Sequence, residues 1–312
     1  MTTSEQFAPS IQRGLRFLHD NQLPYGEFRT YASPSMDMKA TFFDSSIFAT
    51  TYVLYSIARI DRSCVIGMTN KAIAFLTEEM YGPGLFQYFT SKNTRSIDFD
   101  LDDTACASVA LQRSHPFLIG GHNIRYFIEN RNEDGLFYTW VGGAASANDI
   151  DSVVNANVVL YLGDRDETES VCRYLVDTIE SDHESNSYRH YVGNMALYYA
   201  VSRAYACGTP SLSGAREAVI EKVLQSSNAD GSFGNELTTA CAVCSLANFE
   251  YDGGMRLRDA ARYLERQQRA DGSWRRVAMF RGSSFYFGSE ELTTALCLEA
   301  LTRIAAGYVG RT

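Results

Sequence analysis

Apolar and polar residues follow two different patterns along this chain, and both patterns indicate helices. In the first, apolar side chains recur every three to four residues on one face, and charged side chains occupy the other face. This pattern predicts amphipathic helices at a surface. The segments that show it are residues 11–20, 70–80, 123–130, 168–180, 215–226 and 257–268.

The second pattern belongs to segments that are rich in Ala, Thr, Cys and Val and have almost no charged face. A helix without a polar face is buried or lines an interior cavity. The segments that show it are residues 45–60, 103–112, 151–162, 189–205, 236–249 and 291–305. They alternate with the amphipathic segments along the whole sequence.

A short turn motif follows most of the amphipathic segments, as in Gln22-x3-Gly26-x-Phe28 and Gln268-x3-Gly272-x-Trp274. The same spacing joins Met80, Gly84 and Phe86; Arg131, Gly135 and Phe137; and Ser227, Gly231 and Phe233, with a degenerate copy at Tyr174-Leu175. Six such units predict an all-α protein, a double-layered (α/α)6 barrel, with residues 1–312 forming a single domain. An open solenoid is the alternative, but its inner helices normally keep a solvated concave face.

Composition narrows the function classes. The 312 residues are 45% hydrophobic and 21% charged, with a formal net charge of −9, which argues against nucleic acid as a partner. No apolar run approaches the roughly 20 residues that span a bilayer. The polar N-terminus and seven Cys, several in helical segments, indicate a cytoplasmic protein with buried thiols. Cys241 and Cys244 are expected in the core rather than at a zinc site. Oligomeric state and contact with a membrane stay open.

Four acids fall within six residues, at Asp98, Asp100, Asp102 and Asp103, and Thr104 then begins a small-residue helix. One or two acids would be enough to cap a helix. Four this close repel one another, which pushes at least one pKa upward. A carboxylic acid that stays protonated at neutral pH is unusual, and the run is therefore a candidate site.

Long connections precede four of the second-pattern segments, at residues 23–44, 81–102, 133–150 and 272–290, and they are rich in aromatic residues. Long structured loops on a rigid scaffold usually carry function. These aromatic side chains either plug one end of the barrel or form the wall of an apolar pocket above the acid run.

A protonated acid in an apolar, aromatic pocket suits the protonation of a carbon–carbon double bond. Hydrolysis fits less well, because it needs admitted water and a second carboxylate at a defined separation. Aromatic faces would hold the resulting carbocation at about 0.5–2 kcal/mol each. The 18 Phe, 19 Tyr and 2 Trp of the chain are enough to line such a cavity.

The run Asp100-Leu101-Asp102-Asp103-Thr104-Ala105 resembles the DxDDTA motif of class II terpene cyclases, and the turn motifs resemble the QW repeats of that superfamily. The resemblance implies that Asp102 is the proton donor and that Asp100 and Asp103 support it. Protonation of an alkene requires no cofactor, and the absence of the DDxxD signature of ionising terpene enzymes predicts that no metal is essential. Family members usually have two or three helical domains, whereas the six repeat units of this chain make one barrel. It is thus similar to the single-domain cyclases, which act on a polyprenyl chain carried on a hydroxybenzoic acid.

Other candidate residues are weaker. Asn155 and Asn157 either orient the acid or join two helices. Tyr191 and Tyr198, with His190 and Asn194, either receive the final proton or position water, or they only pack. Lys39, Arg275, Arg276 and Arg281 lie in loops, where they either bind an anionic head group or are solvated. The expected catalytic residues are Asp102, Asp100, Asp103, Asn155 and Asn157, and the expected substrate-binding residues are Phe99, Trp140, Tyr161, Tyr191, Tyr198, Phe280, Phe285, Arg275 and Arg281.

Three other functions remain open. Protein prenyltransferase β-subunits share this barrel, but they need a zinc site and a partner subunit. A carbohydrate-active barrel would use Asp102 and Asp151 as acid and base. In a hydrophobic-ligand carrier, the acid run would only cap a helix. The sequence favours a cyclase acting on a polyprenylated small molecule.

Overall fold

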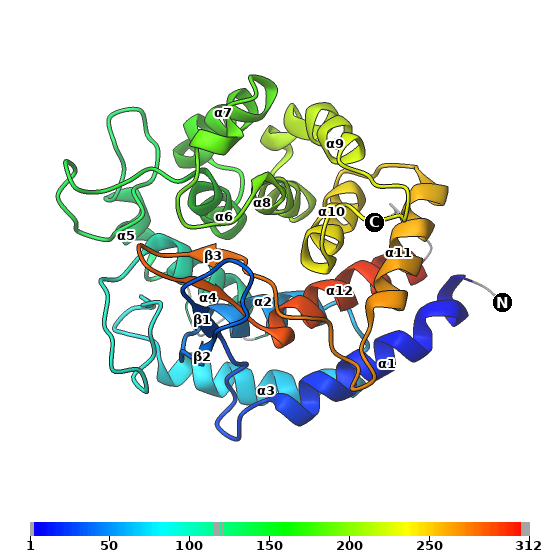
Figure 1. The fold of residues 1–312 in the computed structure, drawn as a ribbon. Helices are drawn as coiled ribbons and strands as arrows, with labels where there is room; N and C mark the ends of the chain where they lie inside the picture. Colours follow the sequence, from blue (N-terminus) through cyan, green and yellow to red (C-terminus); the bar gives the residue numbers. More distant parts are fainter. Residues whose placement is uncertain (1–2, 115–118, 120, 307–312) are drawn as a thin grey trace.

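The computed structural model describes residues 3–114, 119 and 121–306, and twelve α-helices make up most of this part of the chain. They form two concentric layers (Figure 1). The outer helices are α1 (Thr3–Asn21), α3 (Arg62–Glu78), α5 (Ile124–Ile128), α7 (Asp166–Glu180), α9 (Ala215–Gln225) and α11 (Gly254–Gln267). The inner helices are α2 (Phe48–Ile57), α4 (Leu101–Ser114), α6 (Ser152–Leu162), α8 (Asn194–Ala206), α10 (Glu236–Asn248) and α12 (Glu290–Ala305).

The inner helices form a closed ring. Each packs against the next along the chain, and α12 packs back against α2. The outer helix α1 also packs on α12, so the first and last units of the chain are neighbours. All of α2 is buried, as expected for a helix without a charged face. The (α/α)6 barrel predicted from the sequence is therefore confirmed, and the open solenoid is wrong.

The repeated turns join neighbouring units. The Gln22 amide donates to the carbonyl oxygens of Gly26, in its own turn, and of Met68, in the next outer helix, both at 3.0 Å. Gln268 repeats this at the last turn, where its amide donates to Gly272 and to Ser10 of α1, both at 2.9 Å. The last turn is thus attached to the first helix, which closes the ring.

The aromatic residue of each turn is fixed from the other side by the following inner helix. In five units its backbone N–H donates to a polar side chain near the start of that helix. The pairs are Phe28 with Thr50, Phe86 with Thr104, Phe137 with Asn155, Phe233 with Thr239, and Trp274 with Thr294, at 2.9–3.1 Å. Thr104 of the acid run and Asn155 therefore occupy equivalent positions in the repeat.

Three expected helix boundaries were wrong. The helix expected at 11–20 begins at Thr3. The helix expected at 70–80 begins at Arg62, because Asp61 caps it by accepting a hydrogen bond from the N–H of Ser63. The helix expected at 189–205 begins only at Asn194. Gly193 precedes it with φ +79°, which is not helical, and His190 and Val192 instead bond to the backbone of residues 279–281.

Four short strands were not predicted. They are β1 (Tyr31–Ser33), β2 (Phe42–Phe43), β3 (Phe280–Arg281) and β4 (Tyr286–Gly288), and they form an antiparallel sheet in the order β2-β1-β4-β3. The sheet joins the long connection of the first unit to that of the last unit, and its β3–β4 hairpin helps to line the cavity described below.

Candidate active site

The acid run forms the start of α4. The helix begins at Leu101, so Asp102 and Asp103 lie in its first turn rather than before it. Asp100 precedes the helix, and its Oδ1 accepts a hydrogen bond of 2.7 Å from the N–H of Asp103. Asp100 also pairs with Trp140 in an isolated antiparallel bridge, which ties the run to the neighbouring long connection. All three carboxyl groups are buried.

Asp102 is held by donors on both oxygens. The Asn157 amide donates to Oδ1 at 2.7 Å, and the Tyr191 hydroxyl donates to Oδ2 at 2.6 Å. The same amide also contacts the Tyr191 hydroxyl at 3.0 Å. These three side chains come from α4, α6 and the segment before α8, so the barrel brings distant parts of the sequence together at one carboxyl group.

Burial raises the pKa of Asp102 to about 7, and the negative charge of Asp100 adds to this effect. The hydrogen bonds from Tyr191 and Asn157 act in the opposite direction, because they stabilise the ionised form. Burial also raises the pKa of Asp103 well above its usual value, and the Asp100 charge and the hydrogen bond shared with Asp100 raise it further. Near pH 7 the cluster thus retains protons that exposed Asp side chains would have lost.

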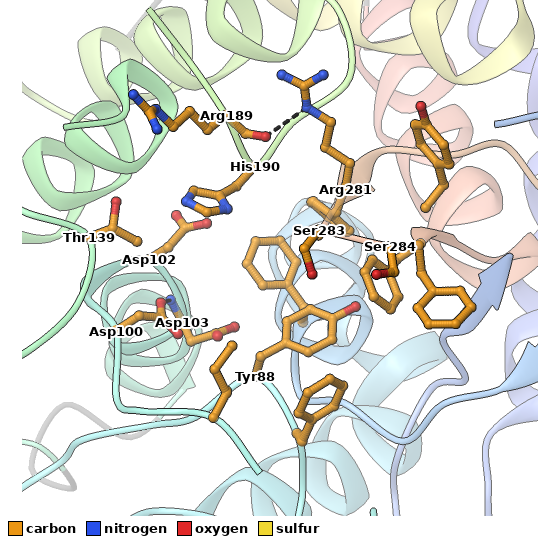
Figure 2. Close-up of a pocket in the computed structure, with 18 of the residues that line it drawn as sticks. Tyr88, Asp100, Asp102, Asp103, Thr139, Arg189, His190, Arg281, Ser283 and Ser284 are labelled. Carbon is orange, nitrogen blue, oxygen red and sulfur yellow. Dashed lines mark hydrogen bonds between the residues drawn. The ribbon is translucent and has the colours of Figure 1, made fainter. Parts of the chain in front are cut away.

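A cavity of about 900 Å³ lies above these acids. Figure 2 shows the three carboxyl groups on one side of it, with Arg281, Ser283 and Ser284 on the other. Half of its lining residues are aromatic or aliphatic, and the arginines and serines of the wall lie in the long connections and beside His190. The lining residues are Pro34, Phe48, Tyr88, Phe89, Arg95, Ile97, Asp100, Asp102, Asp103, Thr139, Trp140, Val154, Arg189, His190, Phe280, Arg281, Gly282, Ser283, Ser284, Phe285, Tyr286 and Phe287.

His190 lines the cavity beside the acids (Figure 2). Its Nε2 lies 2.9 Å from Asp149 Oδ2, and its ring meets that of Trp140 edge to face. Burial on its own lowers the pKa of His190, but the bond to Asp149 and the negative charge of Asp151 raise it overall. A protonated His190 adds positive charge next to Asp100 and Asp102.

Two arginines of the cavity wall, Arg189 and Arg281, form no salt bridge with any carboxylate in the described part of the chain. The Nε of Arg281 donates to the backbone oxygen of Arg189 at 2.7 Å, and the two guanidinium groups point away from each other (Figure 2). Arg95, in contrast, is paired with Asp44 and lies over the ring of Phe89. Arg189 and Arg281 are therefore the cations best placed to bind an anionic group of a ligand.

The structure brings together only some of the residues that the sequence suggested. Asp100, Asp102, Asp103, Trp140, Phe280, Phe285 and Arg281 line the cavity, while Asn157 and Tyr191 contact Asp102. Phe99, Tyr161, Tyr198 and Arg275 are not among the lining residues. Their side chains contact Tyr81, Asn123, Glu184 and Glu236 respectively.

Two asparagines expected beside the acid have different contacts. The Oδ1 of Asn155 accepts from the N–H of Phe137, and its Nδ2 donates to the backbone oxygens of Phe137 and Asp151. It holds a repeat turn and does not reach Asp102. Asp151 itself caps α6, and its second oxygen accepts from the N–H groups of Arg189 and His190. It does not line the cavity, so it cannot act as the base of a carbohydrate-active site there.

Tyr88 and Phe287 belong to the long connections whose aromatic residues were expected to form a pocket wall, and both line the cavity. Sequence reasoning missed Phe48 and Arg189 in the cavity wall, and Arg203 behind Asn157. For Arg203 there was a usable signal: it is the one charged residue in 194–206, an otherwise uncharged helix. Among the described residues, no group of three or more His, Cys, Asp and Glu side chains is arranged to hold a metal ion. Within the same ranges, no helix has the length and apolar character needed to cross a membrane.

Solved structures resemble this chain over nearly its whole length. A protein from Actinoplanes matches with a TM-score of 0.72 at 20% identity, over 96% of this chain and 99% of that one. The type II terpene cyclase MstE from Scytonema, without ligand, matches with a TM-score of 0.74 at 17% identity, over 97% and 99%. A variant of that cyclase in complex with geranylgeranyl dihydroxybenzoate, its substrate, gives 0.72 at 17%, over 98% and 99%.

No protein-family model matches the sequence, and neither does any curated protein. At such low identity the structural likeness concerns the fold. The chain has the fold of the type II terpene cyclases.

Proposed function

We propose that this protein is a class II terpene cyclase that converts a polyprenylated aromatic acid into a polycyclic isomer. The observation that carries the proposal is Asp102, a buried carboxylic acid with a pKa raised to about 7, at the wall of an aromatic cavity of about 900 Å³. Small-molecule sites range over roughly 300–1,000 Å³, so the cavity suits a long, folded substrate.

In the proposed reaction, the Asp102 proton forms a new C–H bond at the terminal double bond of the prenyl chain. The electron pairs of the remaining double bonds then form the ring C–C bonds in turn. Loss of a proton from the last cation forms a new double bond, so the product has the formula of the substrate. The proton that leaves, or one from solvent, restores Asp102.

The residues around Asp102 support this step in two ways. Asn157 and Tyr191 donate to the carboxylate that remains after proton transfer, which stabilises the anion without added water. Aromatic rings of the wall, such as Phe48, Trp140 and Phe280, offer their faces to the cations at about 0.5–2 kcal/mol each. The apolar wall also keeps water from capturing the cations.

The head group is proposed from the cations. Arg189 and Arg281 both belong to the cavity wall, and a carboxylate suits either guanidinium because each can donate two parallel hydrogen bonds. The MstE complex contains geranylgeranyl dihydroxybenzoate, which combines a prenyl chain with such an acid. We therefore favour prenylated hydroxybenzoates over free prenyl diphosphates as substrates.

The test is incubation with geranylgeranyl and farnesyl hydroxybenzoates, beside the free diphosphates, in D₂O. Mass spectrometry should find a product one mass unit heavier than the substrate, and NMR should place the deuterium at the former terminal alkene. Asp102→Asn should remove the product. A ligand carrier would bind the same compounds and return them unchanged, and this result would refute the proposal.

A further inference from the structure

Arg203 of α8 is a buried cation that the proposed reaction does not yet use. It is 2% exposed and is surrounded by tyrosine rings, with its guanidinium carbon 4.9 Å from the centre of Tyr52, 4.7 Å from Tyr55 and 5.1 Å from Tyr199. It forms no salt bridge with a carboxylate of the described residues, and its Nε has no partner there. Burying a charge in this way is costly, so its contacts should indicate what it does.

The contact that matters is with Asn157. Arg203 Nη2 donates to Asn157 Oδ1 at 2.6 Å, and the other end of the same amide donates to Asp102 Oδ1 at 2.7 Å. A guanidinium has donors only, so the amide can present only its oxygen to Arg203. The nitrogen of Asn157 must then face Asp102.

The orientation of this amide affects Asp102 directly. With its nitrogen toward Asp102, the Asn157 amide donates to Asp102 and to the Tyr191 hydroxyl, which itself donates to Asp102. The hydrogen bonds that Asp102 accepts from Asn157 and Tyr191 both favour its ionised form. With its oxygen forward, Asn157 would accept a hydrogen bond from the protonated Asp102 and stabilise its neutral form. The two orientations have almost the same shape, so packing alone does not select between them.

We propose that Arg203 is a positioning residue that fixes the Asn157 amide with its nitrogen toward Asp102, so that the acid faces donors before and after it gives up its proton. This rests on the proposed function for its role in turnover. It also makes a claim about the free protein, which can be tested without any substrate.

The first test is an infrared pH titration of the protonated Asp102 carboxyl group, with its band assigned as the one that Asp102→Asn removes. Arg203→Met should move the midpoint upward by about 1–2 pH units, the size expected when a hydrogen bond to a charged group is lost. Arg203→Lys, which keeps a donor-only cation, should stay within about half a unit of wild type. Asn157→Leu should shift the midpoint upward too, and adding Arg203→Met to it should cause no further shift.

The proposal would be overturned if Arg203→Met folded and titrated like wild type. It would also be overturned if the Asn157→Leu and Arg203→Met shifts added in the double variant. Should Arg203→Met fail to fold, Arg203→Gln replaces it. Its amide can present either end to Asn157, so it should titrate above Arg203→Lys, and equal midpoints would overturn the proposal.

With a prenyl hydroxybenzoate, Arg203→Met should lower kcat by about 10–100-fold and leave KM within about twofold. The alkaline limb of the kcat–pH profile of Arg203→Met should move to higher pH by the same amount as the infrared midpoint. A merely structural defect would not produce this shift. If no prenyl compound is turned over while the infrared shift is seen, the cyclase function fails and the positioning of Asp102 by Arg203 stands.

Discussion

At the scale of single residues, the acid Asp102 determines how the protein should respond to pH. It works as an acid only while protonated, and its pKa is raised to about 7 by burial. We therefore expect kcat to be constant in mildly acidic solution and to fall about tenfold per pH unit above the midpoint. Single-turnover rates over about pH 5–9 measure this. A rate that rises between pH 7 and 9 would mean that a base starts the reaction.

The same shift makes a prediction about stability. The folded protein keeps the Asp102 proton up to about pH 7, whereas the unfolded chain loses it near pH 4. The folded state thus binds more protons between these values, so the free energy of unfolding decreases as pH rises through this window, by about 4 kcal/mol in total. Above about pH 7 this contribution no longer changes.

The side chain introduced by Asp102→Asn cannot ionise, so the free energy of unfolding of this variant should not decrease in this way. Relative to wild type it should gain free energy of unfolding between about pH 4 and 7 and then keep that advantage at higher pH. Urea unfolding of both proteins at several pH values measures the difference. Parallel stability curves would show that Asp102 titrates normally.

At the scale of elements, the β3–β4 hairpin carries the proposed head-group site. Arg281→Met should raise KM for a prenylated hydroxybenzoate about tenfold and change kcat little, because the arginine binds the end of the substrate that does not react. The methyl ester of the same substrate is the matched control, since it has no carboxylate to lose. Equal effects on acid and ester would mean that Arg281 only supports the hairpin.

Single elements also show what the sequence could and could not predict. The twelve helices were predictable because each has a local signature, either an amphipathic face or a run of small apolar residues. The acid run was predictable as a site because four carboxylates lie close together in the chain itself. The sheet was not, because β1 pairs with β4 from the opposite end of the sequence, and strands of two or three residues have no period to detect.

The contacts of Asp102 depend on the same long-range geometry. Asn157 lies in α6, and Tyr191 and Arg203 lie just before and within α8, so the packing of α4, α6 and α8 brings them to one place. Asn155, in contrast, was expected beside the acid and does not contact it. It seemed as good a partner for the acid as Asn157, but it occupies the turn-binding position that Thr104 occupies in its own unit. Aligning the repeats through this position would have separated the two asparagines.

At the scale of the whole molecule, the barrel depends on the contact between its last turn and its first helix. Gly272 has φ +90°, and a Cβ added there would lie 2.4 Å from the backbone oxygen of Arg13 in α1. Gly142 also has a positive φ, of +71°, but an added Cβ would meet nothing within 4 Å. Substitution by Ala therefore forces a side chain into a left-handed conformation at both positions. Only at Gly272 does the added Cβ also clash with the backbone of α1.

We expect Gly142→Ala to cost about 1 kcal/mol, which is the usual penalty for a left-handed residue with a side chain. Gly272→Ala should cost about 3 kcal/mol or more, because a backbone atom cannot turn aside as a side chain can. Urea midpoints of the two variants give the difference. Because Asp102 is bonded by residues of two other units, a ring forced open at α1 should also lower turnover. Equal midpoints would mean that α1 shifts freely on α12 and that the inner ring stays closed without this contact.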